Sequence, residues 1–217
     1  GLMADKTALT GAYPVLSLAD GGAYGLIRQP VAFGFDLTGG VLSNTALYSE
    51  DEGLGYTPEA GALVLSLGRT SEDERLSGQI MATYLSEEDG VLGTGGAGGL
   101  HFTEGFDSSA LTFGTRYRFD SGYSLSASYT EAFSRGGNNE TDSLLSLAST
   151  RLSSSAFALG LERQALATGT DRLRFSVSQP LRVDGGSMRL THDDYYDENE
   201  VLHSRSVDID LAPTGRQ

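Results

Sequence analysis

The stretch LTFGTRYRFDSGYSLSASYTEAF, residues 111–133, alternates bulky side chains with small or polar ones along two runs that a turn separates. In the first run, the odd-numbered positions are Leu111, Phe113, Thr115, Tyr117 and Phe119, and the even-numbered positions are Thr112, Gly114, Arg116 and Arg118. Successive side chains of a β-strand point to opposite faces of the sheet. The first run therefore predicts a strand with one apolar face and one polar face.

The second run repeats this pattern after Asp120-Ser121-Gly122, which has the residue types of a tight turn. Its bulkier parity holds Tyr123, Leu125, Ala127, Tyr129 and Phe133, and its polar parity holds Ser124, Ser126, Ser128 and Thr130. Two alternating runs on either side of a turn predict an antiparallel hairpin.

Similar alternation recurs along most of the chain, and no long stripe with the 3.6-residue period of a helix accompanies it. Further strands are predicted at 31–37, 41–48, 62–68, 76–85, 155–163, 172–179, 187–192 and 201–211. We therefore expect an all-β fold, an antiparallel up-and-down meander of about ten or more strands that forms a barrel or a barrel-like sheet.

The connections between these strands alternate in length. Residues 38–40, 69–75 and 120–122 are short connections, whereas 49–61, 86–109 and 134–154 are long ones; the alternation fades after Arg163. Short turns at one end and long loops at the other are typical of outer-membrane barrels.

Alternation alone leaves open which face is buried. In a soluble barrel or sandwich the bulky residues form the core, and the candidates are Phe113, Tyr117, Tyr129, Phe157, Leu159 and Phe175. In a membrane barrel the same residues face lipid, and the polar parity lines the interior. That parity contains many small groups, namely Ser124, Ser126, Ser128, Ala156, Ala158 and Gly160, which favours a crowded interior.

Composition excludes several functional classes. The net charge of −14 and the lack of a Lys/Arg cluster argue against nucleic acid as a partner. Without cysteine the chain has no disulfide, no thiolate metal site and no Cys nucleophile. No stretch approaches the roughly 18 apolar residues of a membrane-spanning helix, and the start GLMADKT lacks a signal peptide.

The domain prediction is one barrel-like domain over residues 1–217, in which residues 1–30 carry no predicted strand. We expect the chain to be a fragment of a longer protein, with Gly1 left from cloning.

No motif predicts catalysis or cofactor binding. The run GTGGAGG from Gly93 contains a G-x-G-x-x-G spacing but lacks the helix that would hold a pyrophosphate. The histidines are His101, His192 and His203; His192 precedes two aspartates, but no serine-nucleophile motif accompanies them. We therefore predict no catalytic residue and no cofactor.

The acidic segment HDDYYDENE contains the candidate calcium ligands Asp193, Asp194 and Asp197, because clustered carboxylates can bind Ca²⁺. The ligand spacing and glycine of an EF-hand are missing, and acidic residues also occur in other connections. A solvated acidic loop is thus the competing interpretation, and we predict no metal site.

Several segments resemble the C-terminal region of subtilisin-like serine proteases of sphingomonad-type Alphaproteobacteria, which are often described as autotransporter-like. The strongest are VSQPLRVDGGSMRL at 177–190 and DLAPTGRQ at 210–217, followed by LSEEDGVLGTGGAGG at 85–99, GYSLSASYTEAFS at 122–134 and SSSAFALGLER at 153–163. The similarity spans about residues 62–217. Members of that family look as if they continue beyond the position of Gln217 through further strands.

This resemblance implies a non-catalytic β-barrel module of the bacterial cell envelope that anchors, exports or displays an attached protease. The protease domain would precede the barrel, and its catalytic motifs have no counterpart here, so we do not expect this chain to be an enzyme. The expected partners are the attached protease domain, the outer membrane and a second copy at an open sheet edge. The alternative is a soluble module, periplasmic or secreted, that assists the protease in binding or folding.

Overall fold

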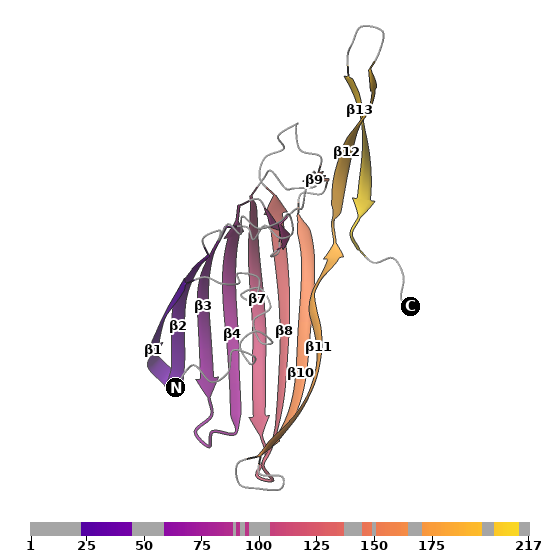
Figure 1. Cartoon of the computed structure of the whole chain (residues 1–217). Helices are drawn as coiled ribbons and strands as arrows, with labels where there is room; N and C mark the ends of the chain where they lie inside the picture. Colours follow the sequence, from indigo (N-terminus) through magenta and orange to yellow (C-terminus); the bar gives the residue numbers. More distant parts are fainter. Residues whose placement is uncertain are drawn as a thin grey trace.

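The computed structural model describes residues 23–44, 59–88, 90–91, 94–95, 105–136, 145–148, 151–164, 171–196 and 202–212. Its main element is an eight-stranded antiparallel sheet in the order β1-β2-β3-β4-β7-β8-β10-β11 (Figure 1). The strands are β1 (Ala23–Pro30), β2 (Phe35–Asn44), β3 (Ala60–Thr70), β4 (Leu76–Glu87), β7 (Phe106–Arg118), β8 (Tyr123–Gly136), β10 (Leu152–Gln164) and β11 (Arg172–Gly185). The predicted all-β antiparallel meander is confirmed.

The main sheet is not closed into a barrel, because β1 and β11 lie at its two ends. A second sheet has the order β13-β12-β9, with β9 (Leu145–Leu147), β12 (Ser187–Tyr196) and β13 (Leu202–Asp210), and a two-stranded sheet joins β5 (Gly90–Val91) to β6 (Thr94–Gly95). In the described part, no helix is long and apolar enough to cross a membrane.

The last two strands form a separate hairpin, β12 with β13, which we call the ribbon. The chain passes from β11 into β12 at Gly186, which has φ +126°, and the ribbon projects beyond the main sheet (Figure 1). The sequence pattern placed these strands in the main meander, and the structure corrects this.

Short and long connections alternate as predicted. Residues 31–34, 71–75, 119–122 and 165–171 connect strands at one end of the main sheet, the short-turn end. Residues 45–59, 88–105 and 137–151 connect strands at the opposite, long-connection end. After Arg163 the connection 165–171 lies at the short-turn end and, among the described strands, no long connection follows it, because only Gly186 separates β11 from β12.

The predicted turn at 38–40 is also wrong, since these residues lie inside β2. A Cβ atom on Gly40 would lie 2.2 Å from Cδ2 of Leu26 on β1, so this glycine makes room for a neighbouring side chain. The turn occurs earlier, at Ala32–Gly34, where Phe33 (φ 61°) and Gly34 (φ 72°) adopt left-handed backbone conformations. Phe rarely adopts this conformation, so the residue types did not place the turn at Phe33.

The turn after β7 is confirmed. Gly122 has φ +79°, and the N–H of Phe119 donates to the carbonyl of Tyr123 at 2.8 Å. β7 and β8 then pair along their whole length, with Phe113 opposite Tyr129.

A small apolar cluster lies near the long-connection end. It consists of Ala60, Ala62, Leu85, Ala110 and Ala132, with Leu42 and Leu181 packed against it. All five central residues share one face of the sheet, as the register across β3, β4, β7 and β8 requires.

Candidate functional site

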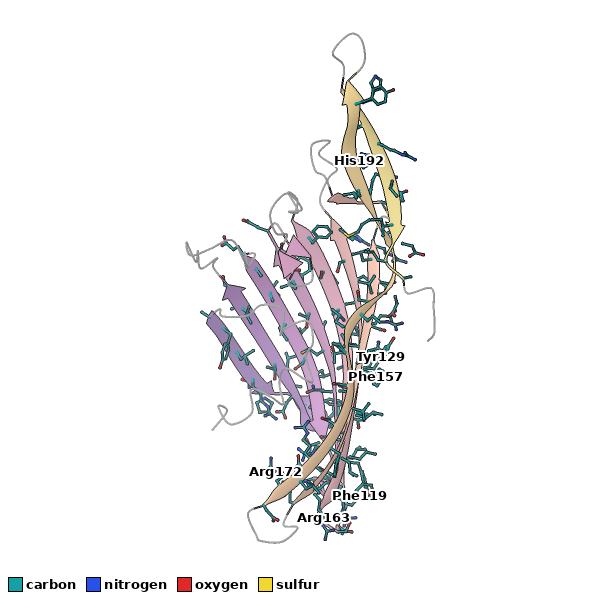
Figure 2. The ribbon with its side chains drawn as sticks, turned by 45° about the vertical axis from the view of Figure 1, so that its right-hand side comes forward. Phe119, Tyr129, Phe157, Arg163, Arg172 and His192 are labelled. Atoms are coloured by element: carbon teal, nitrogen blue, oxygen red, sulfur yellow. The ribbon has the colours of Figure 1, made fainter. Side chains whose placement is uncertain are left out.

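One face of the main sheet is apolar and exposed; we call it the apolar face. Phe113 and Tyr129 are each 47% exposed, and Phe157 is 39% exposed. The apolar face also carries Leu63, Leu65, Leu67, Ile80, Tyr84, Leu111, Tyr117, Leu125, Phe133, Leu159, Leu161, Leu173, Phe175 and Val177, all exposed. Figure 2 shows Tyr129 and Phe157, which are register partners, close together on one side of the sheet.

The opposite face, the polar face, buries hydroxyl groups. Thr112 and Thr130 lie directly opposite each other, with their oxygens 2.8 Å apart, and Ser108 and Ser134 form a second pair at 2.7 Å. All four side chains are at most 2% exposed. Each pairing is favourable because a buried hydroxyl without a hydrogen bond is costly.

The burial data show which face of the main sheet is covered and which is exposed. Many bulky residues are exposed, whereas Thr112, Thr130, Ser108 and Ser134 are buried on the same face as Leu85, Phe106 and Leu152; large exposed apolar surfaces are unusual in a water-soluble sheet. The residues expected as the core of the soluble alternative are all exposed in this structure, namely Phe113, Tyr117, Tyr129, Phe157, Leu159 and Phe175. An exposed apolar surface of this extent marks an interaction site.

We expect the Thr112–Thr130 pair to behave as a unit. Thr112→Val alone leaves the hydroxyl of Thr130 without its partner and should lower the free energy of unfolding by about 1–3 kcal/mol, whereas Thr112→Val with Thr130→Val should be nearly neutral. Denaturant unfolding in detergent measures both variants. Equal losses from one and two substitutions would contradict the pairing.

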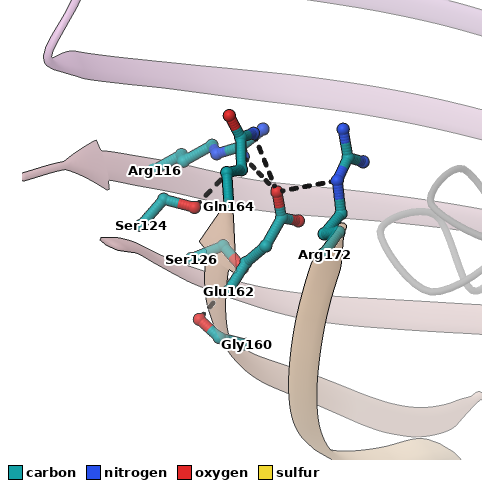
Figure 3. Close-up of polar contacts among 7 residues, drawn as sticks. All are labelled: Arg116, Ser124, Ser126, Gly160, Glu162, Gln164 and Arg172. Carbon is teal, nitrogen blue, oxygen red and sulfur yellow. Dashed lines mark hydrogen bonds and ion pairs between the residues drawn. The ribbon is translucent and has the colours of Figure 1, made fainter. Parts of the chain in front are cut away.

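A charged network occupies the polar face at the short-turn end (Figure 3). The Oε1 atom of Glu162 accepts from Arg116 at 3.4 Å and from Gln164 at 3.1 Å, and lies 3.4 Å from Nε of Arg172. Arg116 also donates to Ser124 at 3.1 Å. The side chain of Glu162 is 12% exposed, whereas those of Arg116 and Arg172 are 41% and 58% exposed, so water screens this network.

Sequence reasoning missed this network. The alternation predicted that Arg116 lies on the polar face. Only the pairing register of the strands shows that Arg116 of β7, Glu162 of β10 and Arg172 of β11 lie close together. The signal in the sequence was that Arg116 and Glu162 both lie on the polar parity of their strands.

The turns and the ribbon carry further ion pairs. A hydrogen bond from Ser71 and one from the backbone N–H of Arg75 hold the pKa of Asp73 below its ordinary value. In the ribbon, Arg189 donates to Asp208 at 2.7 and 3.1 Å, and this contact lowers the pKa of Asp208. These carboxylates stay ionised at neutral pH.

A hollow of about 530 Å³ lies at the short-turn end. Its lining includes Arg28, Asp36, Thr70, Arg75, Arg116 and Arg118. Three of these arginines already have acidic partners, Asp36 for Arg28 at 2.5 Å, Asp120 for Arg75 at 2.6 Å and Glu162 for Arg116 at 3.4 Å. The hollow thus combines both signs of charge.

Comparison of this chain with protein-family models, with curated proteins and with solved structures finds no match. The likeness to subtilisin-associated barrels therefore rests on the sequence segments quoted above.

The histidines considered for catalysis lie on the ribbon, away from the main sheet (Figure 2). His192 is opposite Arg205, and His203 is opposite Tyr195, whose ring stacks on it at 4.9 Å. Neither register partner is a hydroxyl nucleophile of the Ser or Thr type. His101, and Gly93 and Gly98 of the glycine run, lie outside the described residues.

The calcium candidates remain a prediction. Asp193 and Asp194 belong to β12, but Asp197 and the side chains of the other two lie outside the described part. No group of three or more His, Asp or Glu residues in the described ranges could hold a metal ion.

We expect calcium to leave the melting temperature unchanged, because the acidic segment lacks the spacing of a rigid ligand frame. Thermal unfolding with excess Ca²⁺ and with a chelator tests this expectation. A rise of many degrees that Asp193→Asn with Asp194→Asn abolishes would show that these carboxylates bind the ion.

Proposed function

We propose that this chain is a non-catalytic, barrel-forming module of the bacterial outer membrane, which anchors, exports or displays an attached subtilisin-like protease. The observation that carries the proposal is the exposure of the apolar face together with burial of the hydroxyl groups behind it. A face of this composition is stable next to hydrocarbon and unfavourable in water.

Two further features support the membrane part of the proposal. All four short connections lie at one end of the main sheet and all three long ones at the other, as in outer-membrane barrels. The apolar residues Leu111, Phe113 and Tyr117 of β7, together with Phe119, which follows the strand and packs its ring against Tyr117, span nine positions. A tilted transmembrane strand needs roughly 9–11 residues.

The protease part of the proposal rests on the sequence resemblance. The segments at 177–190 and 210–217 resemble the region that follows a subtilisin domain, and this chain carries no subtilisin catalytic motif. The attached domain would therefore perform the chemistry, and this module would hold it at the envelope.

Solubility tests the proposal. We expect the purified chain to aggregate without detergent and to be monodisperse with it, because the apolar face otherwise contacts water. It should also have no peptidase or esterase activity. A monodisperse, detergent-free preparation would contradict the membrane assignment, and turnover abolished by His192→Ala or His203→Ala would contradict the non-catalytic assignment.

A further inference from the structure

The apolar residues of the apolar face form a band that crosses the strands obliquely. On β3 the band consists of Leu63, Leu65 and Leu67. Following the register from Leu65 leads to Ala82 on β4, Leu111 on β7, Glu131 on β8 and Ser155 on β10. A row that begins inside the band on β3 has therefore left it by β8.

On β10 and β11 the band lies nearer the short-turn end. Its residues on β10 are Phe157, Leu159 and Leu161, and on β11 they are Leu173, Phe175 and Val177. On β11, the residue opposite Ser155 is Arg182, and the residue opposite Phe157 is Gln179. Both residues are polar. On β11, the edge of the band toward the long-connection end therefore lies on the short-turn side of Gln179.

The displacement from strand to strand has the size that a tilted barrel requires. Between β3 and β11 the centre of the band moves by roughly one residue per strand. With residues about 3.4 Å apart along a strand and strands about 4.8 Å apart, the strands lie about 35–40° from the perpendicular to the band. Strands in membrane barrels tilt by about 35–45° from the barrel axis.

Charged groups and aromatic rings mark both borders of the band. Toward the long-connection end, Glu131 and Arg182 border it, and beyond Glu131 on β8 the guanidinium of Arg151 lies over the ring of Phe133 at 5.3 Å. Toward the short-turn end, the guanidinium of Arg69 lies over the ring of Phe35 at 5.3 Å, and that of Arg163 lies over Tyr123 at 4.8 Å. Aromatic rings are enriched where hydrocarbon meets water.

We propose that this oblique band is the surface in contact with the bilayer hydrocarbon, and that its borders fix the depth of the module. The halves of β8, β10 and β11 nearest the long-connection end then lie outside the hydrocarbon. The ribbon also lies outside it, although the register partners Met188 with Ile209 and Leu190 with Val207 share one face of the ribbon and Val207 is 46% exposed. This inference rests on the proposed function, because it assumes that the module inserts in a membrane.

Depth-dependent quenching tests the band directly. The chain contains no cysteine, so single-Cys variants of the full chain can be labelled with a fluorophore and refolded in phospholipid vesicles. Leu65→Cys, Ser155→Cys, Leu159→Cys and Val207→Cys are measured with a quencher attached deep in the acyl chains and with a water-soluble quencher. Thr112→Cys, on the polar face, is the control for a site shielded from lipid.

We expect the deep quencher to act several-fold more strongly at Leu65 and Leu159 than at Ser155 and Val207, and the water-soluble quencher to show the opposite order. Equal deep quenching at Leu65 and Ser155 would overturn the oblique band while leaving membrane insertion intact. Deep quenching at Val207 would place the ribbon in the membrane and overturn that part of the inference. No deep quenching at any position would instead contradict the proposed function itself.

Discussion

Phe113→Arg is expected to destabilise the membrane-inserted chain by about 2–4 kcal/mol, the cost of a cationic side chain near the middle of the lipid-facing surface. Phe113 lies in the row that joins Leu67, Ile80, Tyr129 and Phe157, all of them apolar and exposed. An arginine there has hydrocarbon on its outer side and apolar neighbours on both adjacent strands. Reversible unfolding from lipid vesicles by denaturant measures the loss.

Ser109→Arg is the matched control for Phe113→Arg. Ser109 lies on the same strand and the same face, at the border of the band toward the long-connection end, between its register partners Tyr84 and Phe133. The cost of a charge falls to about 0–1 kcal/mol near the interface. Equal and small losses in both variants would show that Phe113 does not face lipid.

Leu85→Ala is expected to lower the free energy of unfolding by about 2–5 kcal/mol, the largest effect of any single truncation considered. Leu85 is 0% exposed and packs among Ala60, Ala62, Ala110 and Ala132. Short alanine side chains cannot extend into the space that the leucine vacates, so a cavity remains. Denaturant unfolding in detergent measures the loss.

Leu65→Ala tests whether this effect depends on the face rather than on the residue type. Leu65 lies on the adjacent strand, on the apolar face, and is 56% exposed. Lipid or detergent can fill the space, since acyl chains are as apolar as leucine, and we expect a loss of under about 1 kcal/mol. If Leu65→Ala cost more than Leu85→Ala, the assignment of the two faces would be wrong.

The sequence alone predicted which residues share a face, because parity is a local property of each strand. Leu111, Phe113 and Tyr117 lie together on the apolar face, and Thr112 and Arg116 lie together on the polar face. A soluble sheet and a membrane sheet are, however, expected to show the same alternation. The structure adds which side is covered, since Thr112 is buried and Phe113 is exposed.

Other features depended on contacts between strands, which parity does not reveal. Gly40 looked like part of a turn but accommodates Leu26 within a strand pair. The two strands of the ribbon alternate as the strands of the main sheet do, with Met188 opposite Ile209, but they do not pair with the main sheet. The Glu162 network and the oblique band both require the register of several strands at once.

Lipid contact along β7 is the most direct test of the central claim, that the apolar face contacts the membrane. Single-Cys variants at positions 111–117, labelled in vesicles and exposed to a lipid-attached quencher, report each side chain in turn. The account predicts strong quenching at Leu111, Phe113, Thr115 and Tyr117 and weak quenching at Thr112, Gly114 and Arg116. Uniformly weak quenching, or strong quenching at the even-numbered positions, would contradict it.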